Sequence, residues 1–375
     1  MKRAVYDVAI VGAGIVGAAC AYECARRGQK VALIDRGPIG SGATAAGMGH
    51  IVVMDDSEAQ FALTRHSQRL WQELRPELPL DVEYDQCGTI WVAADDEEMR
   101  EVRRKHDYYG ERGVATEVLD ARALRNLEPN LREDVRGGLL VSEDGVLYPP
   151  CAARFLTERA KALGAELYLG FSIVRIGQRR LEFDAGEIHA EFLVNAAGAF
   201  APELTPGLAV RKRKGHLVIT DRYPGFVRHQ LVELGYLKSA HAVSLDSVAF
   251  NVQPRRTGQV LIGSSRQYGS NDKEVDHALL AQMLQRAEHY MPGLGQLSTV
   301  RAWTGFRAAT PDKLPLIGPW PRDPSVWLAT GHEGLGITTS LATAQILVDQ
   351  TTGTKSKIPI EPYLPCRMVQ DQVHA

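Results

Sequence analysis

The feature that most constrains the fold is a compact unit of about 30 residues at the start of the chain. An apolar run of buried-strand length leads into three spaced glycines, a helical stretch and a second apolar run that ends in Asp35. This order predicts a strand, turn, helix and strand of the kind that opens a doubly wound, parallel α/β sheet. The parts are residues 6–11, Gly12, Gly14 and Gly17, residues 18–27, and residues 31–34.

Each glycine of this unit has a separate steric task. Gly12 allows the tight turn, Gly14 lets the backbone approach a pyrophosphate, and Gly17 permits close packing of helix on strand. The helix N-terminus then faces the phosphates. Asp35 stands near the ~20-residue spacing at which an acid accepts a hydrogen bond from a ribose 2′-hydroxyl, and it disfavours a 2′-phosphate. The alternative is an ordinary glycine-rich turn, but the complete unit favours a dinucleotide site.

Three later segments favour FAD over NAD. The glycine- and hydroxyl-rich loop Gly40–Gly47 follows the second strand directly, where a nicotinamide enzyme would normally continue into a helix. Residues 190–195 predict a strand that ends in a turn of small residues, 196–199, so the backbone there can lie close to a ligand. Residues 326–349 predict a strand, a loop and a helix, whose N-terminal end could stabilise a reduced, anionic flavin.

Composition limits the other classes of function. The length of 375 residues exceeds what one hydrophobic core supports, so about two domains are expected. A net charge of -2 gives no general attraction to nucleic acid. The five cysteines lack metal-ligand spacing, so we expect no metal site and a reducing, cytoplasmic location. No transmembrane segment is expected, and peripheral attachment to the inner membrane through partners stays open.

Several motifs resemble the D-amino-acid oxidase superfamily, which includes glycine oxidase, sarcosine oxidase and the flavin subunits of D-hydroxyproline dehydrogenase and hydrogen cyanide synthase. The resemblance covers nearly the whole chain. Within the superfamily the likeness is greatest to the beta subunit of D-hydroxyproline dehydrogenase, whereas Glu333 and Leu335 depart from the usual glycine oxidase pattern. Beyond the N-terminal glycines, the motifs are Ser41–Thr44, Val194–Gly198, Arg213–Ile219, Gly263–Gln267, Trp303–Asp312, Pro315–Gly318 and Gly331–Thr338.

The resemblance implies two interleaved domains: a Rossmann-like α/β domain that binds FAD, and a smaller, β-rich α+β domain for the substrate. Short β-rich runs between 210 and 265 and a helical stretch over 273–290 agree with a strand-rich layer above the flavin. The expected FAD-binding segments are 1–85, 145–215 and 300–365, the expected substrate-domain segments are 86–144 and 216–299, and 366–375 is a tail.

The resemblance also implies the chemistry. In this superfamily the substrate α-carbon gives hydride to flavin N5, while an arginine fork fixes the substrate carboxylate. Arg307 matches that arginine, and the alternative is a structural arginine between domains. His332 and Glu333 are candidates for contact with the substrate amine or hydroxyl, or for loop structure alone. His50 is a further candidate for contact with the flavin ring, including the covalent histidyl link of some relatives.

The basic run Arg211–Lys214 is expected to be solvated surface, with a phosphate site or an acidic partner as the alternative.

The residues expected to bind FAD come from five segments. The expected FAD-binding residues are Gly12, Gly14, Ile15, Val16, Gly17, Asp35 and Arg36, then Ser41, Gly42, Ala43, Thr44, Gly47, Met48, Gly49 and His50, then Ala196, Ala197 and Gly198, then Gly305 and Arg307, and finally Gly331, Gly334, Leu335, Gly336, Ile337 and Thr338.

The sequence leaves several functions open. The leading interpretation is the catalytic FAD subunit of a dehydrogenase complex that acts on a D-hydroxyproline-like amino or imino acid. Its partners would be redox subunits that carry an iron–sulfur centre or a second flavin. A stand-alone glycine- or sarcosine-type oxidase that uses oxygen would share the first half-reaction. A flavoprotein subunit that only stabilises its partners would lack the carboxylate clamp, so Arg307 argues against it, and the three ligand segments disfavour an NAD-dependent dehydrogenase.

Overall fold

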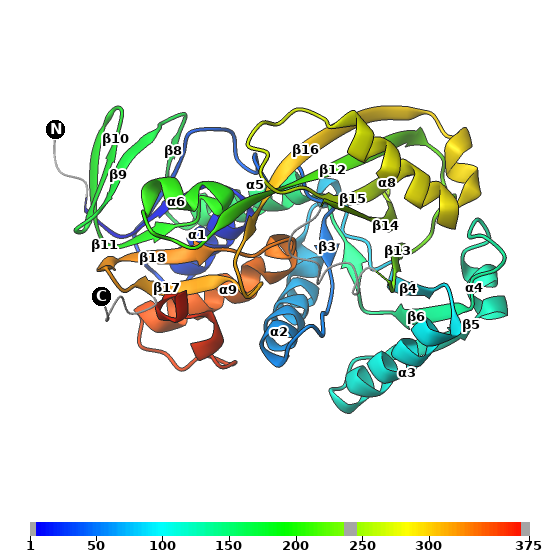
Figure 1. Cartoon of the computed structure of the whole chain (residues 1–375). Coiled ribbons are helices and arrows are strands. Elements are labelled where there is room, and N and C mark those ends of the chain that lie inside the picture. Colours follow the sequence, from blue (N-terminus) through cyan, green and yellow to red (C-terminus); the bar gives the residue numbers. More distant parts are fainter. Residues whose placement is uncertain (1–4, 236–245, 369–375) are drawn as a thin grey trace, which may run out of the picture.

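Two large β-sheets organise the chain, and each carries its own helices (Figure 1). The computed structural model describes residues 5–235 and 246–368. The expected α/β fold class is therefore confirmed, with two sheets of eight strands each among the described residues. No helix in these two ranges is long and apolar enough to cross a bilayer.

The first sheet has β1 at its centre, with the strand order β17-β18-β11-β1-β2-β8 and the hairpin β9-β10 attached to β11. Strands β8, β2, β1, β11 and β18 run parallel, and β17 is antiparallel to β18. The central strands are nearly continuous apolar runs because both faces are covered. The bounds are β1 Val5–Val11, β2 Val31–Asp35, β8 Glu166–Leu169, β9 Ile173–Gly177, β10 Arg180–Phe183, β11 Gly186–Asn195, β17 Leu316–Trp320 and β18 Asp323–Thr330.

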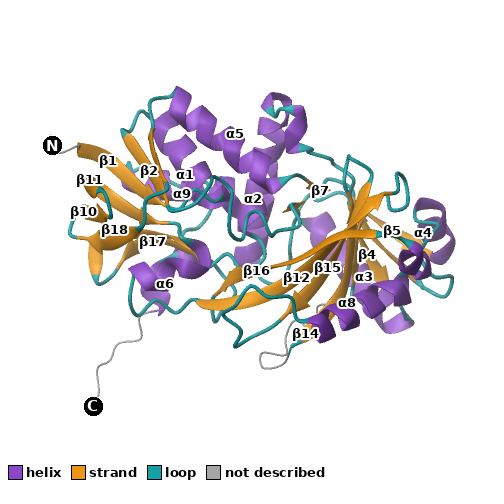
Figure 2. Cartoon of the chain, turned by 90° about the horizontal axis from the view of Figure 1, so that it is seen from above, coloured by secondary structure: helices purple, strands orange, loops and turns teal. Residues whose placement is uncertain are grey.

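Four helices associate with the first sheet, where α1 packs against α5 and α9, and α2 packs against α9 (Figure 2). Small residues on the facing sides, such as Ala18 and Ala344, let the helix backbones approach closely, and Trp71 fills the space beneath α9 with its ring fully buried. This packing fixes the N-terminal ends of α1 and α9. The bounds are α1 Ile15–Arg26, α2 Glu58–Leu74, α5 Pro149–Ala162 and α9 Gly336–Thr351.

The second sheet has the order β16-β12-β15-β14-β13-β4-β6-β5 and is antiparallel except between β13 and β4. Helix α8 packs on β14 and β15, while α3 and α4 pack on the strands at the β5 edge (Figure 2). The strand bounds are β4 Thr89–Ala93, β5 Thr116–Asp120, β6 Gly137–Val141, β12 Arg211–Arg222, β13 Gln230–Glu233, β14 Ser247–Pro254, β15 Gln259–Arg266 and β16 Thr299–Ala309. The helix bounds are α3 Asp96–Glu111, α4 Ala121–Leu127 and α8 His277–Tyr290.

Shorter elements connect the two sheets. The strand pair β3-β7 lies next to the glycine-rich loop, and α6 follows the turn after β11. The bounds are β3 His50–Ile51, β7 Gly145–Val146 and α6 Ala201–Leu204, with 3-10 turns at Arg75–Glu77, Leu80–Val82, Gly198–Phe200, Pro292–Gln296, Glu361–Tyr363 and Pro365–Met368.

The strands and helices expected from the sequence are present. Residues 6–11 and 31–34 lie in β1 and β2, residues 190–195 in β11, and residues 337–349 in α9. The proposed division into two domains stays a prediction, although the strand pairing adds one fact. β16 joins the second sheet through β12, whereas the expected range 300–365 grouped most of it with the FAD-binding segments.

The expectation that the run Arg211–Lys214 is solvated surface is wrong for its second half. Arg213 is 7% exposed and Lys214 is 2% exposed, because β12 lies between β15 and β16 and both of its faces are covered here. The Lys214 ammonium donates to Asp272 Oδ1 at 2.7 Å, which offsets the cost of burying its charge. Arg211 alone of the four is exposed.

Candidate functional site

A cavity of about 770 Å³ lies where the carboxyl ends of β1, β2 and β11 meet the second sheet. This is the place where open α/β sheets bind their ligands. Among the expected FAD-binding residues, the cavity is lined by Gly12, Gly14, Ile15, Val16, Asp35, Arg36, Ser41, Gly42, Ala43, Thr44, Gly47, Met48, Gly49, His50, Ala196, Ala197, Gly198, Gly305, Arg307, Gly334, Leu335, Gly336 and Ile337. The fold therefore brings all five expected segments to one place.

Three expected residues do not line the cavity and lie behind its wall. Gly17 sits under the turn, where a Cβ would come within 1.8 Å of the Gly12 carbonyl oxygen. Gly331 has a φ of +81°, and a Cβ there would meet the Thr310 side chain at 2.6 Å. Thr338 donates through Oγ1 to the His50 carbonyl at 2.8 Å and so ties α9 to the glycine-rich loop. These residues shape the wall.

The turn after β1 has no space for side chains. Gly12 has a φ of +108°, and a Cβ there would lie 2.5 Å from the Ala196 carbonyl oxygen. Asp35 supports the turn, since its Oδ2 accepts from the Ala13 N–H at 2.6 Å and its Oδ1 accepts from the Gly37 N–H at 2.7 Å. The exposed N–H groups at the start of α1 can thus meet a phosphate directly.

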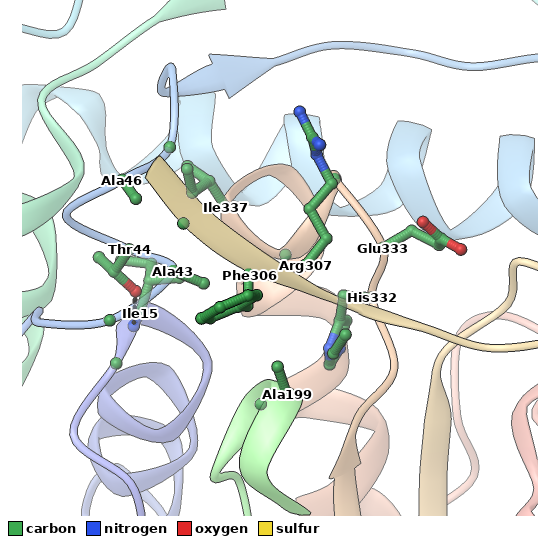
Figure 3. Close-up of a pocket in the computed structure, with 18 of the residues that line it drawn as sticks. Ile15, Ala43, Thr44, Ala46, Ala199, Phe306, Arg307, His332, Glu333 and Ile337 are labelled. Carbon is green, nitrogen blue, oxygen red and sulfur yellow. Dashed lines mark hydrogen bonds between the residues drawn. The ribbon is translucent and has the colours of Figure 1, made fainter. Parts of the chain in front are cut away.

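The glycine-rich loop is fixed to helix α1 and to the second sheet. Thr44 Oγ1 accepts from the Ile15 N–H at 3.0 Å, a contact drawn in Figure 3. Ala46 packs so closely on β16 that a Cβ at Gly305 would lie 2.3 Å from its own Cβ. Further along, Gln253 donates through Nε2 to the Met48 carbonyl at 2.7 Å. The loop is therefore a rigid floor for a ligand that runs between the two sheets.

Arg307 lies across the cavity face of the second sheet. Its Nη1 donates to the Ser265 carbonyl at 2.9 Å, two strands away from its own strand β16. The side chain passes over Gly215 on β12, where a Cβ would come within 2.4 Å of Nη1. The guanidinium is thus held in one position at the cavity wall, as a bidentate carboxylate site requires.

The other two catalytic candidates point elsewhere. Figure 3 shows the Arg307 guanidinium, the Glu333 carboxylate and the His332 ring directed to different sides. His332 Nε2 is hydrogen-bonded to Thr343 Oγ1 of α9 at 3.0 Å, and burial lowers the pKa of His332 to about 3. Its ring is therefore neutral at physiological pH and holds the loop onto α9.

Glu333 forms an ion pair with Arg213 of β12, and both side chains are about nine-tenths buried. Its backbone has a φ of +54°, and its N–H donates to the Ala308 carbonyl at 3.0 Å. Burial raises the pKa of the Glu333 carboxyl, while the charges of Arg213, Arg307 and Arg266 act in the opposite direction. The pair joins the last loop to the second sheet.

His50 also lines the cavity and is affected by the Arg307 charge. Burial lowers the pKa of His50 to about 4, and the Arg307 charge acts in the same direction. Its Nε2 has no hydrogen-bond partner among the described residues, although the residue lines the cavity. The His50 ring is therefore neutral at physiological pH, on a residue of the cavity wall.

Sequence reasoning missed the polar residues that the second sheet contributes. They are Trp91, Gln230, Asn251, Ser264, Arg266 and Trp303, all of which line the cavity. Ser264, Arg266 and Trp303 lie in motifs that carry the resemblance, whereas no motif surrounds Trp91, Gln230 and Asn251. The one usable indication was a polar amide inside an apolar strand, as at Asn251, because a buried strand rarely carries an amide without a partner.

The comparisons with known proteins agree with this geometry. The family model described as FAD dependent oxidoreductase matches residues 7–350. Glycine oxidase of Geobacillus kaustophilus is 28% identical over 374 residues, covering 96% of both chains. Hydrogen cyanide synthase subunit HcnC of Pseudomonas aeruginosa is 28% identical over 417 residues, again with 96% of both covered. The crystal structure of the Geobacillus kaustophilus enzyme superposes with a TM-score of 0.88 at 27% identity, covering 98% of this chain and 100% of the other.

Proposed function

This chain belongs to the family of FAD-dependent oxidoreductases, and on that premise we propose that it oxidises the C–N bond of a small amino or imino acid. The observation that carries the proposal is Arg307, a fixed guanidinium at the wall of the cavity that the FAD segments form. The name of one relative, glycine oxidase, supports a small amino acid as substrate. We further propose a D-hydroxyproline-like substrate and a role as the catalytic subunit of a dehydrogenase complex.

The cavity suits FAD. Gly12 keeps the turn tight, while Gly14 on the cavity wall and the N-terminus of α1 let a pyrophosphate approach the backbone. Asp35 would contact the ribose, and its two backbone hydrogen bonds hold it in place. The N-terminal end of α9, which begins at Gly336 on the cavity wall, would face the flavin ring. These residues would hold the cofactor without rearrangement.

FAD supplies the hydride acceptor, so the side chains of the chain have to orient the substrate. Arg307 binds the carboxylate through two parallel N–H groups and thereby fixes the distance and angle of the α-carbon. His50, neutral because of its burial, adds no second positive charge beside it and offers Nε2 to the substrate amine. Glu333 and His332 position the substrate site indirectly. Glu333 pairs with Arg213 and His332 is hydrogen-bonded to Thr343, and these contacts hold the last loop in place.

A stand-alone oxidase that uses oxygen is the second candidate, and the glycine oxidase relatives support it. Both candidates begin with reduction of the flavin by the substrate, and they differ in the electron acceptor. Rapid oxygen consumption by the isolated chain would favour the oxidase. Fast reduction of a dye together with slow use of oxygen would favour the dehydrogenase subunit.

The test is the anaerobic visible spectrum of the purified holoprotein with D- and L-proline, the hydroxyproline epimers, glycine and sarcosine. We expect a cyclic D-imino acid to bleach the flavin. Arg307→Lys should weaken its binding by about 2–4 kcal/mol, because an ammonium cannot reproduce the fork. Arg100→Lys on the exposed side of α3 is the control. A yellow protein that no amino acid bleaches would contradict the proposal.

A further inference from the structure

Three buried polar side chains meet at the end of the cavity formed by β4, β13 and β14. Trp91, Gln230 and Asn251 are 3%, 2% and 7% exposed, and all three line the cavity. Trp91 Nε1, Gln230 Oε1 and Asn251 Oδ1 have no hydrogen-bond partner among the described residues. Buried polar atoms in proteins are almost always bonded, so three unbonded ones on residues that line the same cavity indicate a ligand or the water that it displaces.

Strand pairing places these side chains on one face of the sheet. Val232 of β13 pairs with Trp91 of β4 on one side and with Asn251 of β14 on the other. Gln230 lies two residues before Val232 and so points to the same face, since side chains alternate along a strand. Strands β14, β13 and β4 follow one another in the sheet (Figure 1). The three polar atoms thus form a row across adjacent strands.

The three side chains of this row carry no charge. It offers one indole N–H donor and two carboxamides, each of which can accept through its oxygen or donate through its nitrogen. The side chains beside it on the cavity wall include Val52, Met54 and Val232, which are apolar. The nearby Lys105 ammonium, 4.8 Å from the centroid of the Trp91 ring, is already paired with Asp55. A group that both donates and accepts, such as a hydroxyl or an amide, therefore satisfies the row.

The row also lies at a suitable distance from Arg307. Arg307 is anchored at Ser265, which pairs with Val248 of β14, whereas Asn251 pairs with Gly263. With ~4.8 Å between strands and ~3.3 Å per residue, the backbones of Ser265 and Asn251 are roughly 8 Å apart. The side chains of Arg307 and Asn251 line the same cavity, so one ligand can contact both. Gln230 and the indole lie on the next strands and would meet a longer substituent or a bridging water.

We propose that Asn251, Gln230 and Trp91 form a subsite for an uncharged hydroxyl- or amide-bearing part of the substrate, whose carboxylate is held by Arg307. This inference rests on the proposed amino acid oxidation and assigns the recognition of the substituent to the second sheet. His332 and Glu333, the residues expected from the sequence to contact a hydroxyl, are engaged with α9 and β12 instead.

The test uses two acids without nitrogen, which cannot be oxidised at a C–N bond: cyclopentanecarboxylate and cis-3-hydroxycyclopentanecarboxylate. Their dissociation constants are measured from the change they cause in the visible spectrum of the holoprotein. We expect the hydroxylated acid to bind about 5- to 30-fold more tightly. Asn251→Leu and Gln230→Leu should reduce this preference, Asn251→Leu to within about twofold. Gln282→Leu, on the exposed face of α8, is the matched control and should keep it.

Equal binding of the two acids by the wild type would overturn the subsite, as would a preference that survives in both variants. If Asn251→Leu does not retain FAD, Asn251→Ser takes its place in the comparison. The binding test and the oxidation test can fail independently of each other. Bleaching by an amino acid without any hydroxyl preference overturns the subsite alone. A hydroxyl preference in a protein that no amino acid bleaches supports the subsite and overturns the proposed oxidation.

Discussion

Gly215→Ala is the substitution that most directly tests the position of Arg307. Gly215 lies on β12 beneath the guanidinium, and an added Cβ would come within 2.4 Å of Nη1, 2.8 Å of Cζ and 2.9 Å of Nη2. Ordinary contacts between such atoms are about 3.5 Å. The guanidinium must therefore withdraw by about 1 Å, which also disturbs its 2.9 Å hydrogen bond to the Ser265 carbonyl. The backbone of Gly215 has no positive φ that would oppose alanine.

The expected effect is large on catalysis and small on stability. A displacement of about 1 Å in a substrate-positioning group can lower the rate about 100-fold, so we expect kcat/KM for the carboxylate substrate to fall about 10- to 100-fold. Because the methyl group displaces the end of a flexible side chain, the free energy of unfolding should change by no more than about 1 kcal/mol. The FAD content should stay the same.

The assay is anaerobic stopped-flow reduction of the flavin over a range of substrate concentrations, together with thermal unfolding of the holoprotein. Gly110→Ala is the matched control, because Gly110 lies in α3 and an added Cβ meets nothing within 4 Å. It should leave flavin reduction unchanged. Wild-type reduction kinetics in Gly215→Ala would refute the reasoning, since they would mean that the observed position of Arg307 is not the one that binds the carboxylate.

Three further predictions concern the cofactor turn and a buried acid. Gly12→Ala should yield protein without FAD, measured by the ratio of flavin to protein absorbance, because its Cβ would lie 2.5 Å from a backbone oxygen that cannot move. Asp35→Ala removes two hydrogen bonds to backbone N–H groups and should raise the dissociation constant of FAD at least about tenfold, measured by fluorescence titration. Burial raises the pKa of Asp144 to about 7 from 3.8, so its contribution to stability is lost as pH rises from about 4 to 7. The melting temperature of Asp144→Asn relative to the wild type should thus increase between pH 5 and pH 8, and a constant difference would contradict the raised pKa.

The N-terminal unit could be predicted from the sequence because its requirements are local. The spacing of Gly12, Gly14 and Gly17 between two apolar runs meets steric demands that arise within a few residues of each glycine. The structure agrees, since a Cβ at Gly12 or Gly17 would collide with a neighbouring backbone oxygen. The strands and α9 could be predicted for the same reason, because the residues that indicate each element lie within one short segment.

The burial and the partners of the charged residues could not be predicted from local sequence. The run Arg211–Lys214 has the composition of solvated surface, yet Arg213 and Lys214 are buried, where Arg213 pairs with Glu333 and Lys214 pairs with Asp272. Glu333 and Arg307 were both expected to contact the substrate, yet the Glu333 carboxylate pairs with Arg213 and the Arg307 guanidinium reaches Ser265. These partners lie on segments that are distant in the chain, so no local pattern specifies them.

The sequence by itself determined the dinucleotide turn and the fold class, because short-range sterics and spacing encode them, and the resemblance to a known superfamily identified Arg307 as a candidate clamp. Only the tertiary structure placed Trp91, Gln230 and Asn251 in one row, since their alignment depends on the register of three strands brought together from three parts of the chain. A change of one residue in that register would turn each side chain to the opposite face of the sheet. The composition of the cavity wall is therefore a property of strand pairing, which local sequence does not carry.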